Sequence, residues 1–159
     1  MMPAPFVVLA CGNPSRGDDA LGPLLLARLD RYLACAGRAG CYELIEDFQF
    51  QVEHALDLQH RTGVLFIDAS ESAAAPFELC PLRPDPSPSH STHAISPGAV
   101  LSVYERIAGE APPPAWLLSV RGNSYELGEG LSEPARRHLE AAWLALERFC
   151  QTHFVRPVV

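Results

Sequence analysis

The sequence contains no lysine, because all twelve of its basic residues are arginine. This absence excludes three kinds of site that depend on a lysine amine: a phosphate-binding P-loop, a Schiff base and a lysine general base. The formal net charge of −7 at pH 7 argues against nucleic acid as a partner, since non-specific binding to a phosphate backbone comes from clustered basic side chains. A metal ion, or a basic segment of another protein, suits this acidic chain better.

Long apolar runs are absent as well. No apolar segment approaches the roughly 20 residues of a membrane helix, and the N-terminus lacks the charged-then-apolar order of a signal peptide. We therefore expect no membrane segment and a cytoplasmic location. The five cysteines form no CxxC pair, and no GxSxG motif occurs. These absences argue against a disulfide framework, a zinc knuckle and a serine hydrolase, so we expect buried or free thiols.

The order of strand-like and helix-like segments predicts the fold. The predicted strands are 6–10, 42–46, 63–67, 77–82 and 116–120, and the predicted helices are 20–33, 51–59 and two that begin after Ser96 and Ser132. Pro81 places the strand 77–82 near an edge of the sheet. The pattern predicts a single α/β domain over residues 1–159, with helices on both faces of a twisted, mostly parallel sheet of about five strands, which makes three layers.

The most informative segment is the glycine-rich turn after the first predicted strand, Cys11-Gly12-Asn13-Pro14-Ser15-Arg16-Gly17-Asp18-Asp19. It lies at the carboxyl end of a strand, where open α/β sheets place their chemistry. A turn built for nucleotide phosphates offers backbone N–H groups, whereas this turn offers two carboxylates, which suit a cation. We interpret Asp18 as the cap of the following helix and Asp19 as part of a pocket.

Two further polar residues are expected at the same edge of the sheet. Asp68 directly follows the strand 63–67, and His93 lies in a loop rich in serine and histidine before the helix at Ser96. Together with Asp19 they offer two carboxylates and an imidazole. Such a set can hold Zn²⁺, Ni²⁺, Mn²⁺ or Fe²⁺ with positions open for water or substrate, and spacing alone does not choose the metal.

Each of these residues also has a purely structural interpretation. An Asp-Asp pair before a helix can simply cap it, an aspartate at a strand end can be a turn residue, and a histidine in a polar loop is usually solvated. We interpret His90 as such a solvated loop histidine. Cys11 continues an apolar strand and has no evident base in the sequence, so we expect a buried thiol rather than a nucleophile.

In combination, these segments resemble the nickel-iron hydrogenase maturation endopeptidases. Residues 8–22 are similar to the opening motif of that family, and residues 65–69 are similar to its strand-plus-aspartate block. Ser91-Thr92-His93 is similar to its histidine block, and residues 126–132 resemble its loop before the last helix. The four blocks occur in order over nearly the whole chain, and the first of them is the most specific.

The resemblance implies a function and a site. Members of the family remove a short C-terminal peptide from the hydrogenase large-subunit precursor once nickel has been inserted. The resemblance places Asp19, Asp68 and His93 at three metal-binding and catalytic positions, in the crevice between the first and third strands. There they would recognise nickel that the precursor's cysteines already hold, and so position the scissile bond. Whether a metal-bound water or a carboxylate-activated water attacks the peptide stays open.

The same resemblance implies that nickel arrives with the substrate, so the isolated protein is metal-free or holds a surrogate divalent ion. The large-subunit precursor is the expected partner, and a monomer suffices to engage its tail. The sequence leaves two other functions open. One is a non-catalytic module that checks nickel loading of the precursor, and the other is an unrelated small metallohydrolase that uses the same ligands on small amides.

One turn departs from the family pattern. Many members carry an Asp-Gly-Gly-Thr-like turn after the second strand, where this chain has Asp47-Phe48-Gln49-Phe50-Gln51. Asp-Phe-Gln turns of this kind resemble a branch that serves soluble, NAD-reducing hydrogenases. Because the exchange alters backbone freedom and the surface offered to the precursor, Asp47, Phe48 and Gln49 are predicted to take part in recognition. For one of the two phenylalanines, Phe48 or Phe50, packing beneath the second predicted helix is an equally good explanation.

Overall fold

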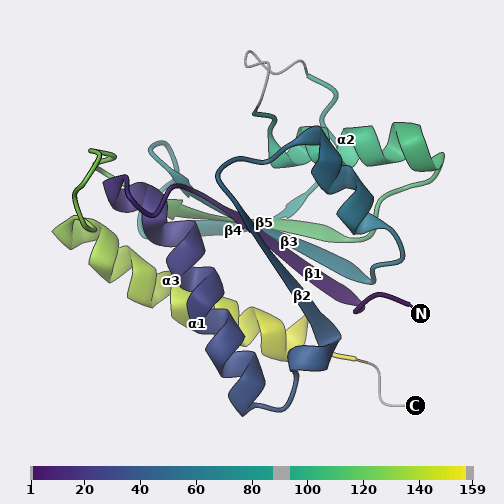
Figure 1. The fold of residues 1–159 in the computed structure, drawn as a ribbon, viewed down its shortest axis with the longest axis horizontal. Helices are drawn as coiled ribbons and strands as arrows, with labels where there is room; N and C mark the ends of the chain where they lie inside the picture. Colours follow the sequence, from purple (N-terminus) through teal and green to yellow (C-terminus); the bar gives the residue numbers. More distant parts are fainter. Residues whose placement is uncertain (1, 88–93, 157–159) are drawn as a thin grey trace.

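A five-stranded sheet in the order β2-β1-β3-β5-β4 forms the centre of the computed structural model, which describes residues 2–87 and 94–156 (Figure 1). The strands are β1 (Phe6–Cys11), β2 (Tyr42–Asp47), β3 (Gly63–Ser70), β4 (Phe77–Leu82) and β5 (Ala115–Arg121). β1, β2, β3 and β5 are parallel, and β4 pairs with β5 in the antiparallel direction at one edge. This confirms the predicted mostly parallel sheet and the edge position of the strand that contains Pro81.

Helices cover both faces of this sheet, as predicted. The α-helices of the described residues are α1 (Leu21–Cys35), α2 (Pro97–Ala108) and α3 (Glu133–Thr152), and the short 3-10 helices are η1 (Gly17–Ala20), η2 (Ala39–Cys41) and η3 (Val52–Leu58). Figure 1 shows α1 and α3 on one face, and α2 with η3 on the other. The side chains of Ser96 and Ser132 cap α2 and α3, as the sequence predicts. Within the described residues, no helix has the length and apolar character that a bilayer span requires.

The two faces of the sheet have separate cores. Successive side chains of a strand point to opposite faces, so β1 and β3 contribute side chains to both cores. The side chains toward α1 and α3 include Val8, Ala10, Leu65 and Ile67, and those toward α2 and η3 include Val7, Leu9, Cys11, Val64 and Phe66. Two covered faces explain why both strands are apolar almost without interruption.

The path of the chain creates a topological switch point between β1 and β3. From β1 the chain passes through α1 to β2 on one side, and it then returns past β1 to β3 on the other side. Neighbouring parallel strands whose connections lead in opposite directions form a switch point, where α/β folds bind ligands at the carboxyl ends. Ala10 pairs with Ile67 in this register, so the next residues along the two strands, Cys11 and Asp68, lie at this switch point.

Gly22 allows α1 to approach the end of β1 closely. A Cβ atom at Gly22 would lie 2.6 Å from the carbonyl oxygen of Cys11, so a side chain there would push the helix away from the sheet. Gly22→Ala is expected to lower the free energy of unfolding by about 1–3 kcal/mol, as overpacked cores do, in urea denaturation. Gly40→Ala is the control, because a Cβ there meets nothing within 4 Å. Equal losses of stability in the two variants would contradict this account.

Candidate active site at the carboxyl ends of β1 and β3

The structure brings Asp19 and Asp68 together beside Cys11. Asp19 lies in η1, directly after the turn that follows β1, and Asp68 lies near the end of β3, where it pairs with Ser119 of β5. The two carboxylates are close enough that the charge of Asp19 raises the pKa of Asp68, and both charges raise the pKa of the Cys11 thiol. The pair therefore forms a small anionic centre at the β1–β3 switch point.

The carboxylate of Asp19 is oriented by its own turn. The backbone N–H of Asn13 donates a hydrogen bond of 2.7 Å to Oδ2 of Asp19, and the N–H of Asp19 donates to the carbonyl of Arg16. The side chain of Asn13 in turn accepts from the N–H of Ser15 at 2.9 Å. These bonds close the loop between β1 and η1 and hold Asp19 beside the carboxyl end of β1.

Asp68 is the more strongly perturbed of the two carboxyl groups. Burial raises its pKa to about 6, and the charge of Asp19 acts in the same direction, while hydrogen bonds from the Cys11 thiol and the Ala69 N–H lower it. A carboxylate that is partly desolvated and next to a like charge favours either a proton or a cation. This is the chemistry of a site that receives a positively charged ligand.

Cys11 is a buried thiol and not an activated nucleophile. Its side chain is 5% exposed, and burial, followed by the charges of Asp68 and Asp19, raises its pKa well above the ordinary value. The thiol is therefore protonated at neutral pH, which confirms the expectation from the sequence. All five cysteines are free, with Cys150 also buried, as expected.

The prediction that Asp18 caps the first helix is wrong. Neither η1 nor α1 has a side-chain cap, and the carboxylate of Asp18 is 0% exposed. It accepts four hydrogen bonds from the far end of the chain: the N–H groups of Asn123, Ser124 and Ser132 at 2.8, 3.0 and 2.7 Å, and the Ser132 hydroxyl at 2.6 Å. Burial alone would raise the pKa of Asp18, but these bonds outweigh burial and lower it.

Asp18 thereby connects the glycine-rich turn 11–19, hereafter the acidic turn, to the segment 122–132, which joins β5 to α3. Three backbone hydrogen bonds run between the same two segments: Gly17 N–H to Glu129, Asp18 N–H to Ser124, and Gly128 N–H to Ser15. In Figure 1 this segment lies beside the start of α1. The position of Asp19 thus depends on residues more than a hundred positions later in the chain.

Sequence reasoning missed Tyr125, which lies in this connecting segment. Its hydroxyl oxygen is buried and has no hydrogen-bond partner among the described residues. Burial raises the pKa of Tyr125 to about 12, and the charges of four carboxylates add to the rise, those of Glu71, Asp19, Asp68 and Asp18. No motif marks this tyrosine, and its only sequence signal is a position just after the carboxyl end of a strand.

The turn 47–51, which differs in sequence from the family pattern, lies at the same edge of the sheet. Asp47 ends β2 opposite Cys11, and its carboxylate accepts the Phe48 N–H at 2.7 Å and lies 3.3 Å from Nε2 of His54. Nδ1 of that histidine accepts the Gln51 N–H at 2.9 Å, so the ring presents its Nε2–H to Asp47. The turn is therefore held rigidly by η3.

The two phenylalanines of this turn have different surroundings. Phe50 is 4% exposed and packs edge-on against Phe66 with ring centroids 5.3 Å apart. Phe48 is 65% exposed. Core packing therefore accounts for Phe50, and Phe48 is presented to solvent.

His93, the third predicted metal ligand, and His90 lie outside the described residues. Across residues 2–87 and 94–156, no three histidine, cysteine or acidic side chains are grouped so as to hold a metal ion. What the described residues bring together is the carboxylate pair of Asp19 and Asp68.

Solved structures of hydrogenase maturation proteases resemble this fold over nearly its whole length. The hydrogenase maturating endopeptidase HybD from E. coli superposes with a TM-score of 0.67 at 22% identity, covering 95% of this chain and 93% of its own. The maturation protease HycI from Thermococcus kodakarensis gives 0.68 at 21% identity and covers 94% of each chain. A hydrogenase 2 maturation peptidase from a Thaumarchaeota archaeon superposes with a TM-score of 0.60 at 20% identity, covering 91% of this chain and 97% of its own. No family model and no curated protein matches the sequence.

Proposed function

We propose that this protein is an endopeptidase that removes the C-terminal extension of a nickel-iron hydrogenase large-subunit precursor after nickel insertion. The observation that carries the proposal is the meeting of Asp19 and Asp68 at the β1–β3 switch point, in a fold that matches solved hydrogenase maturation proteases. The sequence motifs that resemble that family surround the same two residues. The partner is the precursor, met by a monomer in the cytoplasm.

In this proposal nickel belongs to the substrate. Asp19, Asp68 and His93 bind the nickel that the precursor holds, and the anionic pair supplies oxygen ligands for a divalent cation. Binding of the cation also relieves the repulsion that raises the pKa of Asp68. Because the cleavable tail is attached to the same precursor, docking of the nickel brings the scissile peptide bond to the crevice and converts cleavage into an effectively intramolecular step.

The turn Asp47-Phe48-Gln49 takes part in recognising the precursor in this proposal. Phe48 supplies an exposed aromatic side chain in the turn directly after β2, and the Asp47 carboxylate lies 3.3 Å from Nε2 of His54. A single exposed apolar side chain is common on protein surfaces. Here Val52 and Leu56 of η3, which follow Phe48 in the chain, are exposed as well. From the Asp-Phe-Gln turn alone, we assign the substrate to the soluble, NAD-reducing hydrogenases.

The proposal predicts that nickel controls cleavage. Mixed with a nickel-loaded precursor, the protein is expected to shorten the large subunit by its C-terminal extension, whereas the nickel-free precursor keeps its full mass. The reason is that the carboxylate pair has no cation to bind in the nickel-free form. Intact-mass spectrometry of the precursor before and after mixing measures the outcome.

Two results would support the other functions instead. A stable complex with nickel-loaded precursor of unchanged mass would indicate a module that checks nickel loading without cutting. Cleavage of small amides or unrelated peptides in the absence of any precursor would indicate a general metallohydrolase. The first result would exclude the proposed endopeptidase activity, and the second would contradict its restriction to the nickel-loaded precursor.

A further inference from the structure

The edge strand β4 has a neighbouring strand on one side only, within the residues that the structure describes. The Pro76 carbonyl accepts the N–H of Arg121 at the end of β5. Because bonding alternates along an antiparallel strand, every second residue of β4 then bonds to β5 and those in between face outward. The outward residues are Phe77, Leu79 and Pro81. Their backbone groups take part in no other hydrogen bond of the described residues.

An apolar groove lies beside this outer edge. Its apolar lining consists of two side chains of β4 and four of α3: Phe77, Leu79, Ala141, Leu144, Ala145 and Phe149. Leu144 is 65% exposed. The edge therefore offers main-chain donors and acceptors next to an apolar surface, the combination by which a sheet takes up a further strand.

The sequence of β4 is self-complementary in an antiparallel register centred on Leu79. In that register Leu79 lies opposite Leu79 of a second copy, and Phe77 lies opposite Pro81. The Leu79 N–H donates to the opposite Leu79 carbonyl and the Phe77 N–H to the Pro81 carbonyl, each twice by symmetry. Every outward N–H of β4 finds an acceptor, and the proline, which has no N–H, stands where it removes the fewest bonds.

The neighbouring registers are worse. A register centred on Glu78 places the two Glu78 carboxylates directly opposite each other, and like charges in that position are destabilising. A register centred on Cys80 keeps only the bond from the Leu79 N–H to the Pro81 carbonyl, again twice. With Leu79 at the centre, Glu78 lies opposite Cys80 instead, so the carboxylates stay apart. Glu78 and Pro81 thus leave one favourable register.

We propose that a second copy of this chain binds at this edge, and that the two copies pair through β4 around Leu79, joining two five-stranded sheets into one. Pairing also covers the exposed Leu144 of each copy. The shared surface is one short strand and a groove, and small interfaces are weak, so single and paired copies exchange. β5 and β4 separate β3 from this edge, so a single copy still meets each precursor. The inference does not rest on the proposed function.

Sedimentation equilibrium tests the pairing. The mass of the wild type is expected to rise with protein concentration from 17.3 kDa toward twice that value. Leu79→Pro removes the central outward N–H without removing a bond to β5, so this variant is expected to stay at 17.3 kDa. Leu144→Glu, a replacement at an exposed position that leaves β4 intact, is expected to lose pairing as well, because it brings a charge into the apolar contact. The matched control is Ile107→Glu on α2, which is 54% exposed and should pair like the wild type.

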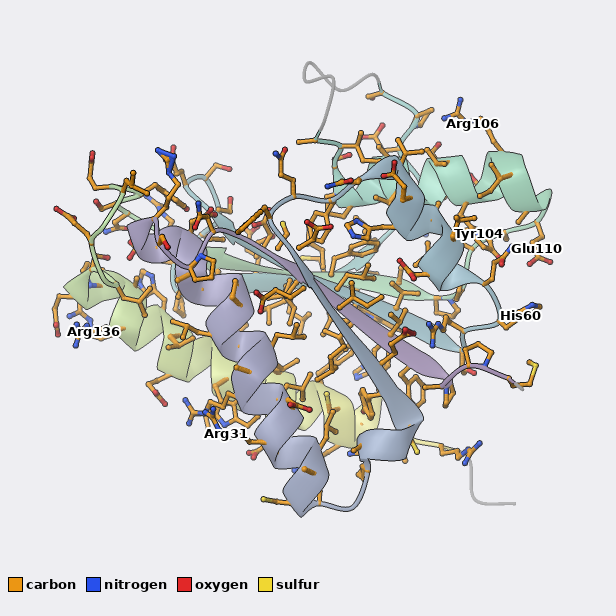
Figure 2. The ribbon with its side chains drawn as sticks, viewed as in Figure 1. Arg31, His60, Tyr104, Arg106, Glu110 and Arg136 are labelled. Atoms are coloured by element: carbon orange, nitrogen blue, oxygen red, sulfur yellow. The ribbon has the colours of Figure 1, made fainter. Side chains whose placement is uncertain are left out.

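Glu78→Cys tests the register. It places a thiol opposite Cys80 of the second copy, in a pair without backbone bonds whose Cα atoms lie about 4.5 Å apart, within the range of a disulfide. Oxidised glutathione is expected to produce a covalent dimer, with the link between positions 78 and 80 identified by peptide mass. Glu105→Cys is the control and should give no such link. It lies on α2 next to Arg106, which Figure 2 shows far from Arg136 on α3.

Three results would overturn the inference. The first is a wild type that stays at 17.3 kDa even at millimolar concentration. The second is pairing that persists in both Leu79→Pro and Leu144→Glu, which would place the contact elsewhere. The third is a paired Glu78→Cys variant that yields no link between positions 78 and 80, which would exclude the register.

Discussion

Asp68→Asn is expected to slow processing of nickel-loaded precursor strongly and, at neutral pH, to raise the free energy of unfolding. The amide has nearly the same shape but carries no charge, so the candidate site loses one of its two described carboxylates. We expect processing to slow by at least about 100-fold. A 100-fold slower rate corresponds to a barrier about 2.7 kcal/mol higher, which is less than the several kcal/mol by which a bound metal ion can stabilise a transition state. Time courses of precursor mass measure the loss.

The gain in stability follows from the direction of the pKa shift. Burial raises the pKa of Asp68 from 3.8 to about 6, so the folded protein disfavours the ionised form. The penalty is absent below pH 3.8, grows as the pH rises toward 6, and is complete above that value. Asp68→Asn escapes the penalty, so its advantage in urea denaturation should increase between pH 3.8 and about pH 6 and stay constant above that value.

Asp30→Asn is the control for both effects. It removes the same charge from an exposed position on α1, and surface replacements of this kind usually change stability little. We expect wild-type processing and nearly wild-type stability from this variant. Processing by Asp68→Asn at the wild-type rate would remove Asp68 from the site.

Asp18→Ala is expected to be among the most destabilising single replacements, although it lies one residue from the proposed site. The change leaves three backbone N–H groups and the Ser132 hydroxyl without their common acceptor in a buried environment. Losing hydrogen bonds to a buried charged group in this way costs about 3–5 kcal/mol. Urea denaturation at neutral pH measures the loss, and Glu126→Gln, an exposed neutralisation in the same segment, is the control.

The contribution of Asp18 also has a defined pH dependence. Its pKa is lowered in the folded state, so its carboxylate stabilises the fold at every pH above the ordinary value of 3.8. The contribution is lost as the pH falls from that value through the lower folded pKa. The difference in stability between the wild type and Asp18→Ala should therefore be constant at neutral pH and shrink below pH 3.8. A difference that is small at neutral pH would contradict the anchoring role of Asp18.

Elements and caps could be predicted because their causes are local. The apolar runs of β1 and β3 reflect burial on both faces, and Ser96-Pro97 and Ser132 carry the signals of helix starts. Parallel strands place their carboxyl ends at one edge, so the approach of Asp19 to Asp68 followed from strand order and needed no knowledge of side-chain contacts.

Other features depend on contacts between distant parts of the chain. An aspartate before a helix looks the same whether it caps that helix or bonds to a remote segment, and the partners of Asp18 lie 105 to 114 residues away. Tyr125 has no local motif, because its surroundings are formed by residues of the acidic turn and of β3. The turn 47–51 shows the same limit, since only packing on Phe66 separates the buried Phe50 from the exposed Phe48.

The bonds from Asp18 to the segment 122–132 also bear on the order of events during synthesis. A ribosome releases the N-terminal turn long before residues 123–132, and chains fold in the order in which their contacts become available. A nascent or truncated chain that ends before β5 carries both Asp19 and Asp68 but lacks every hydrogen-bond donor to the Asp18 carboxylate. The acidic turn is therefore completed only when nearly the whole protein has been made, so a fragment that ends before β5 holds Asp19 and Asp68 without the finished turn that positions them.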